Sequence, residues 1–284
     1  MIARLTILFL LLFKFASSNS PDIQAKHVFN LMLDRLKNVS TASFRLLSTE
    51  RMKDGKISQS DMLVKLQSKP QRIYIYCVNP NPGVEVLWPI SMTDDRMLIN
   101  PNGFPYVNLK INQQNSLVRK NTHHIIEEIG FNYLSDMISY YIDMYGENFY
   151  RYIRITDTIT YDNKSCIRLV YDFSDYDMIL YLVKKNESLT DIAGRFKLSD
   201  YHLLCLNPSI KDYTDIHAGQ IIRIPNFYNR KIEFIIDRKS YMPLVQTVSD
   251  EKGMYEKYEW RNIILNPELS EEDFSPLNKK YGFR

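Results

Sequence analysis

The sequence YLVKKNESLTDIAGRFKLSDYHLLCLNPSIKDYTDIHAGQIIRIPN, residues 181–226, decides how the chain is divided. It opens and closes on short apolar runs of the kind that form strands. Between these runs, Leu189, Ile192 and Phe196 recur at i, i+3 and i+7, which places them on one face of a two-turn helix. A second helical segment, capped by Ser199, follows and ends before a proline. The segment therefore predicts a strand, two helices and a strand in fewer than 50 residues.

Several residue types at fixed spacings make this segment similar to the LysM family over its whole length. The matching residues are 183–189, Ile192-Ala193 with Phe196, Leu204 with Asn207-Pro208, and 219–225. The chain has Asn186-Glu187 where the family usually has Gly-Asp. Asn tolerates the positive φ that the turn requires, and Glu keeps the charge on a longer side chain. The departure therefore bears on sugar affinity more than on the fold.

The LysM resemblance implies a shallow groove that binds N-acetylglucosamine-containing glycans such as peptidoglycan. The groove lies between the first strand–helix loop and the loop before the last strand. Carried over by position, the glycan-binding residues are Glu187, Ser188, Leu189, Asn207, Pro208 and Ile210. Acetamido groups need backbone hydrogen bonds and a small apolar contact, which such loops can provide, and we expect Glu187 and Ile210 to be exposed. The alternative is purely structural, with Ser188 only a helix cap and Leu189 only a core residue.

Residues 19–178 and 229–284 form the second predicted unit, of class α+β. A helix is predicted at 23–39, with Ser20 as its cap, and one or two more at 123–145. The predicted strands are 43–51, 60–67, 73–78, 84–88, 97–99, 150–161, 166–171, 231–237, 244–249 and 254–264. Frequent turn signals between most of these strands indicate an antiparallel meander. Strand signals on both sides of 181–226 predict that the LysM module is inserted at a loop of one sheet.

This larger unit resembles, less specifically, a family of secreted bacterial proteins known only as a domain of unknown function. The matching residues are Glu50-Arg51 with 54–56, Val64-Lys65 with Lys69-Pro70, 82–86, 123–130, and Leu265-Asn266 with Asp273-Phe274. That family is similar to periplasmic lipoprotein carriers, which have a curved antiparallel half-barrel closed by helices. The resemblance implies this fold and a lipid, lipoprotein or protein ligand, and it implies no reaction.

The N-terminus predicts export. Arg4 precedes a short apolar run at 5–13, and Ala16-Ser17-Ser18 supplies the small residues of a signal-peptidase site. Residues 1–18 are therefore interpreted as a signal peptide, which places the protein in the periplasm or the outer cell envelope. The apolar run is far shorter than the roughly 20 residues that cross a bilayer, although an uncleaved anchor remains the alternative.

Composition excludes some classes of partner. The net charge is only +3, and Lys and Arg are scattered among Asp and Glu, so nucleic-acid binding is not expected. Cys77, Cys166 and Cys205 allow at most one disulfide. Cys77 and Cys166, both in predicted strands, either pair or stay free, and Cys205 is interpreted as a buried apolar residue. The cysteine spacing fits no metal site, and we expect no cofactor.

Signals for catalysis are weak. His124 and Glu128 lie at i, i+4, a spacing that can chelate a metal on a helix, but a polar helix face is the preferred interpretation. Glu50, Arg51 and Glu85 are interpreted as a structural ion pair. We therefore predict an exported, non-enzymatic protein bound to the cell wall through LysM. The alternative is a divergent peptidoglycan hydrolase that LysM targets to its substrate.

Overall fold

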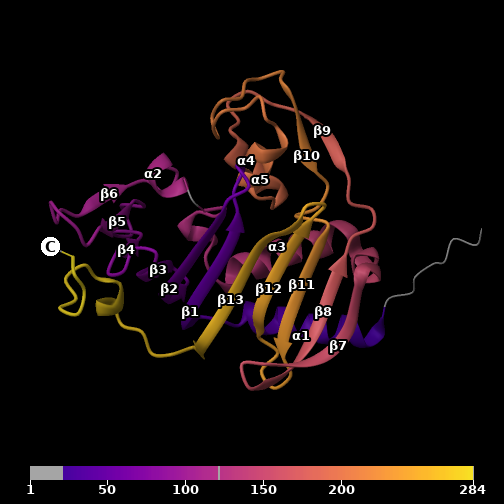
Figure 1. Cartoon of the computed structure of the whole chain (residues 1–284), viewed down its shortest axis with the longest axis horizontal. Coiled ribbons are helices and arrows are strands. Elements are labelled where there is room, and N and C mark those ends of the chain that lie inside the picture. The colour runs from indigo at the N-terminus through magenta and orange to yellow at the C-terminus, as the bar shows by residue number, and fades with distance from the viewer. Residues whose placement is uncertain (1–21, 121, 284) are drawn as a thin grey trace, which may run out of the picture.

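The computed structural model describes residues 22–120 and 122–283. It consists of a large curved antiparallel sheet with helices against one face and a small module at one end (Figure 1). The predicted signal peptide, residues 1–18, lies outside the described residues. Within the described ranges, no helix combines the length and the apolar character needed to cross a membrane.

The main sheet has eleven strands, and all of its neighbouring strands are antiparallel. From one edge to the other they are β6 (Leu109–Ile111), β5 (Met97–Asn100), β4 (Glu85–Trp88), β3 (Gln71–Asn79), β2 (Ile57–Ser68), β1 (Thr41–Arg51), β13 (Gly253–Leu265), β12 (Pro243–Asp250), β11 (Lys231–Asp237), β8 (Lys164–Asp172) and β7 (Ile153–Tyr161). Each predicted strand is present, except that residues 150–152 belong to the 3-10 helix η2 (Gly146–Tyr152). Strand β6 was not predicted, because three residues are too few to show a period.

Side-chain alternation decides which face of the sheet is buried. On β1, Ala42, Phe44 and Leu46 are buried while the residues between them are partly exposed. These three side chains point to the concave face, where the ring of Phe44 lies 5.3 Å from that of Phe131 on a covering helix. The outer face is covered in part by the C-terminal tail, whose Tyr281 ring stacks 3.8 Å from Tyr74 of β3.

Two long helices cover the concave face on the side of β13, β12, β11 and β8 (Figure 1). They are α1 (Ile23–Lys37) and α3 (Phe131–Tyr145), and the short 3-10 helix η1 (Ile126–Glu128) precedes α3. The cap of α1 is Asp22, whose carboxylate accepts the Ala25 N–H at 3.0 Å, and the predicted cap Ser20 lies outside the described residues. The main core therefore lies between these helices and the sheet.

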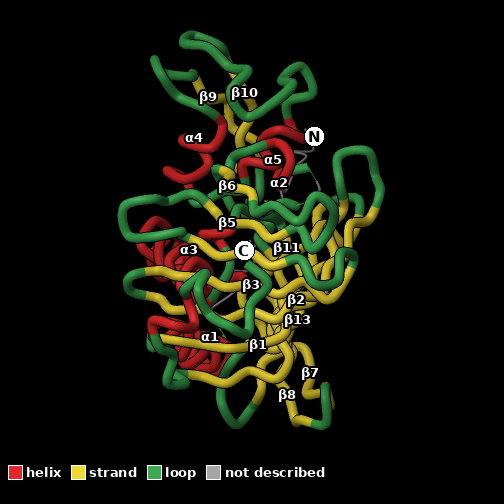
Figure 2. Tube along the Cα trace, turned by 90° about the vertical axis from the view of Figure 1, so that its left-hand side faces the viewer, coloured by secondary structure: helices red, strands yellow, loops and turns green. Residues whose placement is uncertain are grey.

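The LysM-like module fills a hairpin connection of the main sheet. Its elements are β9 (Met178–Leu182), α4 (Leu189–Phe196), α5 (Asp200–Leu206) and β10 (Ile221–Pro225). Strands β9 and β10 form a separate two-stranded sheet that projects at one end of the molecule (Figure 2). Strands β8 and β11 are hydrogen-bonded neighbours in the main sheet, so the module occupies the chain connection between two adjacent strands. The predicted class, α+β with an antiparallel half-barrel and a βααβ module, is confirmed.

The module is docked firmly on the main domain. Its Asp200 makes a 2.5 Å ion pair with Arg119, and both side chains are at least 95% buried. The Tyr201 ring stacks 4.6 Å from that of His123, and the Tyr201 hydroxyl accepts the Lys53 N–H at 2.7 Å. These contacts tie the module to the main domain through α5.

All three cysteines carry free thiols. Cys166 is buried on the outer face of the sheet, and burial raises the pKa of its thiol. Cys205 is partly buried against the main core, which agrees with its interpretation as an apolar residue. The disulfide between Cys77 and Cys166, left open by the sequence, is not formed in this structure.

Candidate functional site

The first strand–helix loop of the module is built as the sequence predicts. Asn186 has a φ of +62°, which turns the chain out of the strand. Ser188 then caps α4 through a reciprocal pair of bonds with Asp191. The Asp191 N–H donates to Ser188 Oγ at 3.1 Å, and the Ser188 N–H donates to Asp191 Oδ2 at 2.8 Å. The entry of α4 is therefore fixed.

Three of the predicted glycan-binding residues, Leu189, Asn207 and Ile210, are buried inside the module, where they have structural roles. Leu189 and Ile210 are 0% and 1% exposed in the core of the module, so the expectation that Ile210 is exposed is wrong. Asn207, 8% exposed, joins the end of α5 to β10. Its Nδ2 donates to the carbonyls of Leu203 at 2.8 Å and Arg223 at 2.9 Å, and its Oδ1 accepts the Arg223 N–H. These side chains hold the module together and do not present themselves to a sugar.

Glu187 is also engaged inside the module. Its side chain is only 7% exposed and makes a 2.5 Å ion pair with Arg195. The carboxylate accepts the Lys184 N–H at 2.7 Å and the Tyr181 hydroxyl at 3.0 Å. The expectation that Glu187 is exposed is therefore wrong. All of these donors lie on the module itself, so the carboxylate stabilises the first strand–helix loop.

An open cleft of about 820 Å³ lies between the module and the main domain. Its module side includes both loops of the predicted groove, since Ser188 belongs to the first and 212–214 to the second. The loops touch where the Leu189 N–H donates to the Tyr213 carbonyl at 2.8 Å. The cleft is lined by Gln114, Ser116, Leu117, Arg119, Lys120, Ser188, Thr190, Asp191, Tyr201, Leu204, Asp212, Tyr213 and Thr214. Of the six predicted residues, only Ser188 is among them, and the exposed Pro208 is not.

The sequence missed most of the cleft because it is formed by tertiary contact. Residues 114–120, which include the short helix α2 (Ser116–Arg119), come from the main domain and have no periodic pattern. The loop 212–214 is an ordinary polar loop in sequence. Its Thr214 and Asp212 are exposed, and the Thr214 hydroxyl donates to Asp212 at 2.8 Å. Only the docking of the module brings these segments together.

Arg119 lies in the wall of the cleft and pairs with a residue of the module. It is 3% exposed, and Asp200, its partner in the module, also accepts the Thr190 hydroxyl at 2.8 Å. The guanidinium lies 4.4 Å from the centre of the Tyr213 ring. Burial, the first cause, raises the pKa of the Tyr213 hydroxyl to about 12, so this side chain is neutral at physiological pH. The ion pair and the ring contact both tie Arg119 to the module.

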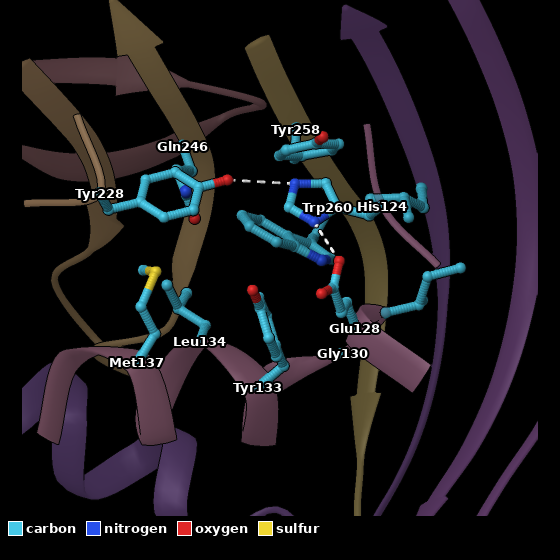
Figure 3. A pocket seen from close by; sticks show the side chains of 12 residues that line it. His124, Glu128, Gly130, Tyr133, Leu134, Met137, Tyr228, Gln246, Tyr258 and Trp260 are labelled. Atoms are coloured by element: carbon cyan, nitrogen blue, oxygen red, sulfur yellow. Dashed lines mark hydrogen bonds and ion pairs between the residues drawn. The ribbon is translucent and has the colours of Figure 1, made fainter. Parts of the chain in front are cut away.

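A second candidate region lies on the concave face of the sheet (Figure 3). Two cavities of about 70 and 240 Å³ share Leu46, His124, Ile129 and Tyr258 in their walls. Most of the remaining wall is apolar, and α3 closes the smaller cavity, with Tyr133 pointing toward the sheet in Figure 3. For comparison, an apolar cavity of about 150 Å³ takes up benzene. The larger cavity therefore has room for a short apolar group but not for a complete acyl chain.

The interpretation of His124 and Glu128 as a polar helix face is wrong, and the preceding His123 is not on a helix either. His123 is 0% exposed, and residues 123–125 precede η1 in a non-helical segment at the end of the sheet. The His123 Nδ1 lies 2.9 Å from Glu256 Oε2, and the His123 backbone N–H donates to Glu50 at 3.1 Å. One signal was available in the sequence. Glu50 lies four positions after Leu46 and Glu256 four positions before Trp260, and both of these apolar residues face the core, which places both carboxylates on the concave face.

His124 completes a buried network with these carboxylates. Its Nδ1 lies 2.7 Å from Glu128, and its Nε2 lies 3.2 Å from the Tyr228 hydroxyl, as the dashed lines in Figure 3 mark. Burial lowers the pKa of His124, but Glu256 and Glu128 together raise it well above the usual value. Burial likewise raises the pKa of Glu256, and the two histidines outweigh that effect and hold it far below the usual range. The network therefore keeps His124 protonated and Glu256 ionised.

Glu50, Arg51 and Glu85 do not form the predicted ion pair. Arg51 pairs with Asp250, and Glu50 accepts the Tyr258 hydroxyl at 2.6 Å. Glu85 is buried on the sheet, where it accepts the Tyr74 hydroxyl at 2.7 Å. The structural interpretation of these residues stands, but with other partners. Across residues 22–120 and 122–283, no group of three or more His, Cys, Asp or Glu side chains is arranged to hold a metal ion.

Comparison with known families agrees with this division of the chain. The family described as protein of unknown function (DUF1571) matches residues 39–191, more than half of the 284 residues. The chain belongs to the DUF1571 family. The LysM domain matches residues 181–225, the segment identified from its sequence. The DUF1571 match ends inside the LysM segment, so strands β11, β12 and β13 of the same sheet lie outside it. No curated protein matches this DUF1571 chain.

Solved structures similar to the DUF1571 chain include two mycobacterial proteins. LprF of Mycobacterium bovis has a TM-score of 0.43 at 9% identity, covering 88% of this chain and 97% of LprF. Lipoprotein LppX of Mycobacterium tuberculosis has a TM-score of 0.40 at 11% identity, covering 87% of this chain and 98% of LppX. A DUF1329 family protein of Desulfovibrio piger has a TM-score of 0.33 at 11% identity, covering 88% and 97%. At these scores, the likenesses say nothing about the ligand of the DUF1571 sheet.

Proposed function

We propose that this DUF1571 protein is exported to the periplasm or outer cell envelope and binds the cell wall without catalysing a reaction. Its LysM module binds an N-acetylglucosamine-containing glycan, with peptidoglycan as the ligand. The observation that carries this function is the open cleft of about 820 Å³ against the two loops of a complete LysM module. Its volume falls within the range of about 300–1,000 Å³ that is usual for ligand sites.

The chemistry of the cleft suits a sugar. Ser188, Thr190 and Thr214 place hydroxyl groups in its wall, and Asp212 places a carboxylate there. Leu204 adds an apolar surface. Sugars carry many hydroxyl groups around an apolar ring face, so a wall with a few polar groups beside an apolar contact can orient them. The six residues predicted from family position are replaced in this proposal by the residues that line the cleft.

The half-barrel binds a lipid-like or protein ligand through its concave cavity. The cavity of about 240 Å³ has mostly apolar walls, and Gln113 and Arg119 are among its polar lining residues. Gln113 Oε1 and Arg119 Nε and Nη1 are buried without a hydrogen-bond partner in the described part of the chain. Buried polar atoms are usually paired, so these atoms support a ligand with both a donor and an acceptor. The small volume limits its apolar part to a short group.

Burial of the acidic residues supports a protein without hydrolase activity. Glu50 and Glu256 are register partners on β1 and β13, which is the kind of carboxylate pair a glycosidase needs. Both are buried, at 3% and 0% exposure, and they already accept bonds from tyrosines and histidines. Neither carboxylate is among the residues that line the open cleft. The alternative hypothesis is a divergent peptidoglycan hydrolase. A zymogram on purified peptidoglycan distinguishes this enzyme from a protein that only binds the wall.

A sedimentation assay tests glycan binding directly. The mature chain, residues 19–284, is mixed with insoluble peptidoglycan, and we expect a weak but measurable fraction in the pellet, because a single shallow module buries little area. Asp212→Ala should reduce this fraction, whereas Asp157→Ala, at an exposed position outside the cleft, should not. Equal partitioning of wild type and Asp212→Ala would refute the cleft, and a wild type that never pellets would refute glycan binding.

A further inference from the structure

We propose that the glycan cleft is a composite site in which the DUF1571 domain supplies the second wall. This wall is the segment 114–120, and its ligand is an uncharged N-acetylated oligosaccharide. The inference rests on the proposed glycan binding and extends it, because the LysM module alone then holds only half of the site. The structural basis is a single cleft shared by α2 of the main domain and both loops of the module.

The apolar contact in the second wall is Leu117. Its side chain is 74% exposed and lines the cleft opposite the module. Gln114 and Ser116 beside it are exposed and polar. Across the cleft, Ser188 and Thr214 present hydroxyl groups. A sugar between these walls places an acetamido methyl or a ring face on Leu117 and its hydroxyl groups on the module.

The two walls are held at a fixed separation. Arg119 directly follows the exposed part of α2, and its ion pair with Asp200 ties this wall to the first residue of α5. On the same side, Thr190 donates to Asp200, which ties α4 into the same contact. A site whose walls are already ordered loses less entropy when a ligand binds. The composite cleft is therefore preformed and does not need the sugar to assemble it.

Charge in the cleft decides the class of glycan. Asp191 and Asp212 lie on the module side, and Lys120 lies on the α2 side, while Arg119 is neutralised by Asp200. The two exposed carboxylates outnumber the one exposed cation. Carboxylates accept strong hydrogen bonds from hydroxyl groups and repel anions. The cleft therefore favours neutral sugars over polymers that carry phosphate or uronate groups.

The test measures binding of the N-acetylglucosamine hexamer to the full mature chain by calorimetry. Leu117→Asp should weaken binding at least tenfold, and Leu117→Ala should weaken it by a smaller factor. Leu277→Asp is the matched control, because Leu277 is an 86% exposed leucine that does not line the cleft. Unchanged melting temperatures for all three variants exclude unfolding as the cause. A hexamer in which every sugar carries a carboxylate should bind more weakly than the neutral one.

The outcomes separate the two levels of the proposal. If Asp212→Ala weakens binding and Leu117→Asp does not, the composite wall is overturned and glycan binding by the module stands. If the wild type binds no hexamer and no peptidoglycan, glycan binding itself is overturned, and the composite site with it. If the acidic hexamer binds more tightly than the neutral one, the assignment of an uncharged ligand is overturned.

Discussion

At the scale of single residues, buried ionisable groups dominate the behaviour of this protein. The lowered pKa of Glu256 makes its ionised form stabilising at neutral pH, and that contribution is lost as the pH falls through its folded pKa. The raised pKa of His124 works in the other direction, since its contribution is present below the ordinary histidine pKa and is lost at higher pH. Together, these two groups favour an intermediate pH range.

His202 provides a separate and testable pH dependence. Burial, the first cause, lowers its pKa to about 4, in spite of Glu256 and Asp250, while His123 lowers it further. The unfolded chain then binds the proton more tightly, so stability falls between about pH 6.5 and 4, by about 3 kcal/mol. The rings of His202 and Tyr255 lie 5.0 Å apart, and His202→Phe keeps a ring at this position. We therefore expect this variant to lose much less stability over the same pH range.

Urea unfolding at pH 7 and at pH 4 measures this difference. His217→Phe is the control, because His217 is exposed and its substitution should leave the pH dependence of the wild type unchanged. If His202→Phe and the wild type lose the same free energy of unfolding between the two pH values, His202 is not the titrating group.

At the scale of elements, the sequence predicts best where a long period is present. The alternation on β1 and the stripe at Leu189, Ile192 and Phe196 both gave elements that the structure contains. The segments that were missed, β6 and α2, have three and four residues, too short for any period to appear. Of these two elements, α2 contributes to one wall of the cleft, and no residue of the LysM segment could have indicated it.

The ion pair between Arg119 of α2 and Asp200 of α5 is a buried contact between elements, and breaking it should cost substantial stability. Arg119→Met leaves Asp200 buried without its partner, so we expect a loss of about 3–5 kcal/mol in the free energy of unfolding. The matched control is Arg45→Met, which breaks an ion pair with Asp61 whose arginine is 40% exposed and should cost far less stability, because solvent screens an exposed pair. Chemical denaturation of both variants measures the difference, and equal losses would contradict the assigned importance of the buried pair.

At the scale of the whole molecule, export is the first property to establish. The predicted cleavage after Ser18 leaves a mature chain that begins at Asn19. Mass spectrometry of the protein recovered from the cell envelope should give this N-terminus. A mature protein that still begins at Met1 would contradict the signal peptide and the periplasmic or surface location together.

The arrangement of the whole chain also predicts what happens when the LysM module is removed. Strands β8 and β11 are neighbours, and β9 pairs with β10, so the two ends of 181–226 lie close together. A short Gly-containing linker can therefore replace this segment, and the main sheet should still fold. The shortened chain loses the contacts of Tyr201 and Asp200, so we expect its melting temperature to fall by roughly 5–10 °C, which corresponds to about 2–3 kcal/mol.

Calorimetry of the shortened chain distinguishes an insertion from a part of the core. A single cooperative transition, at lower temperature than in the wild type, is expected because the helices α1 and α3 still cover the sheet. A chain that melts without a cooperative transition would mean that the module completes the core of the main domain. In that case, the contact of Tyr201 with His123 is part of the fold of the sheet, and the LysM segment has become inseparable from the domain that carries it.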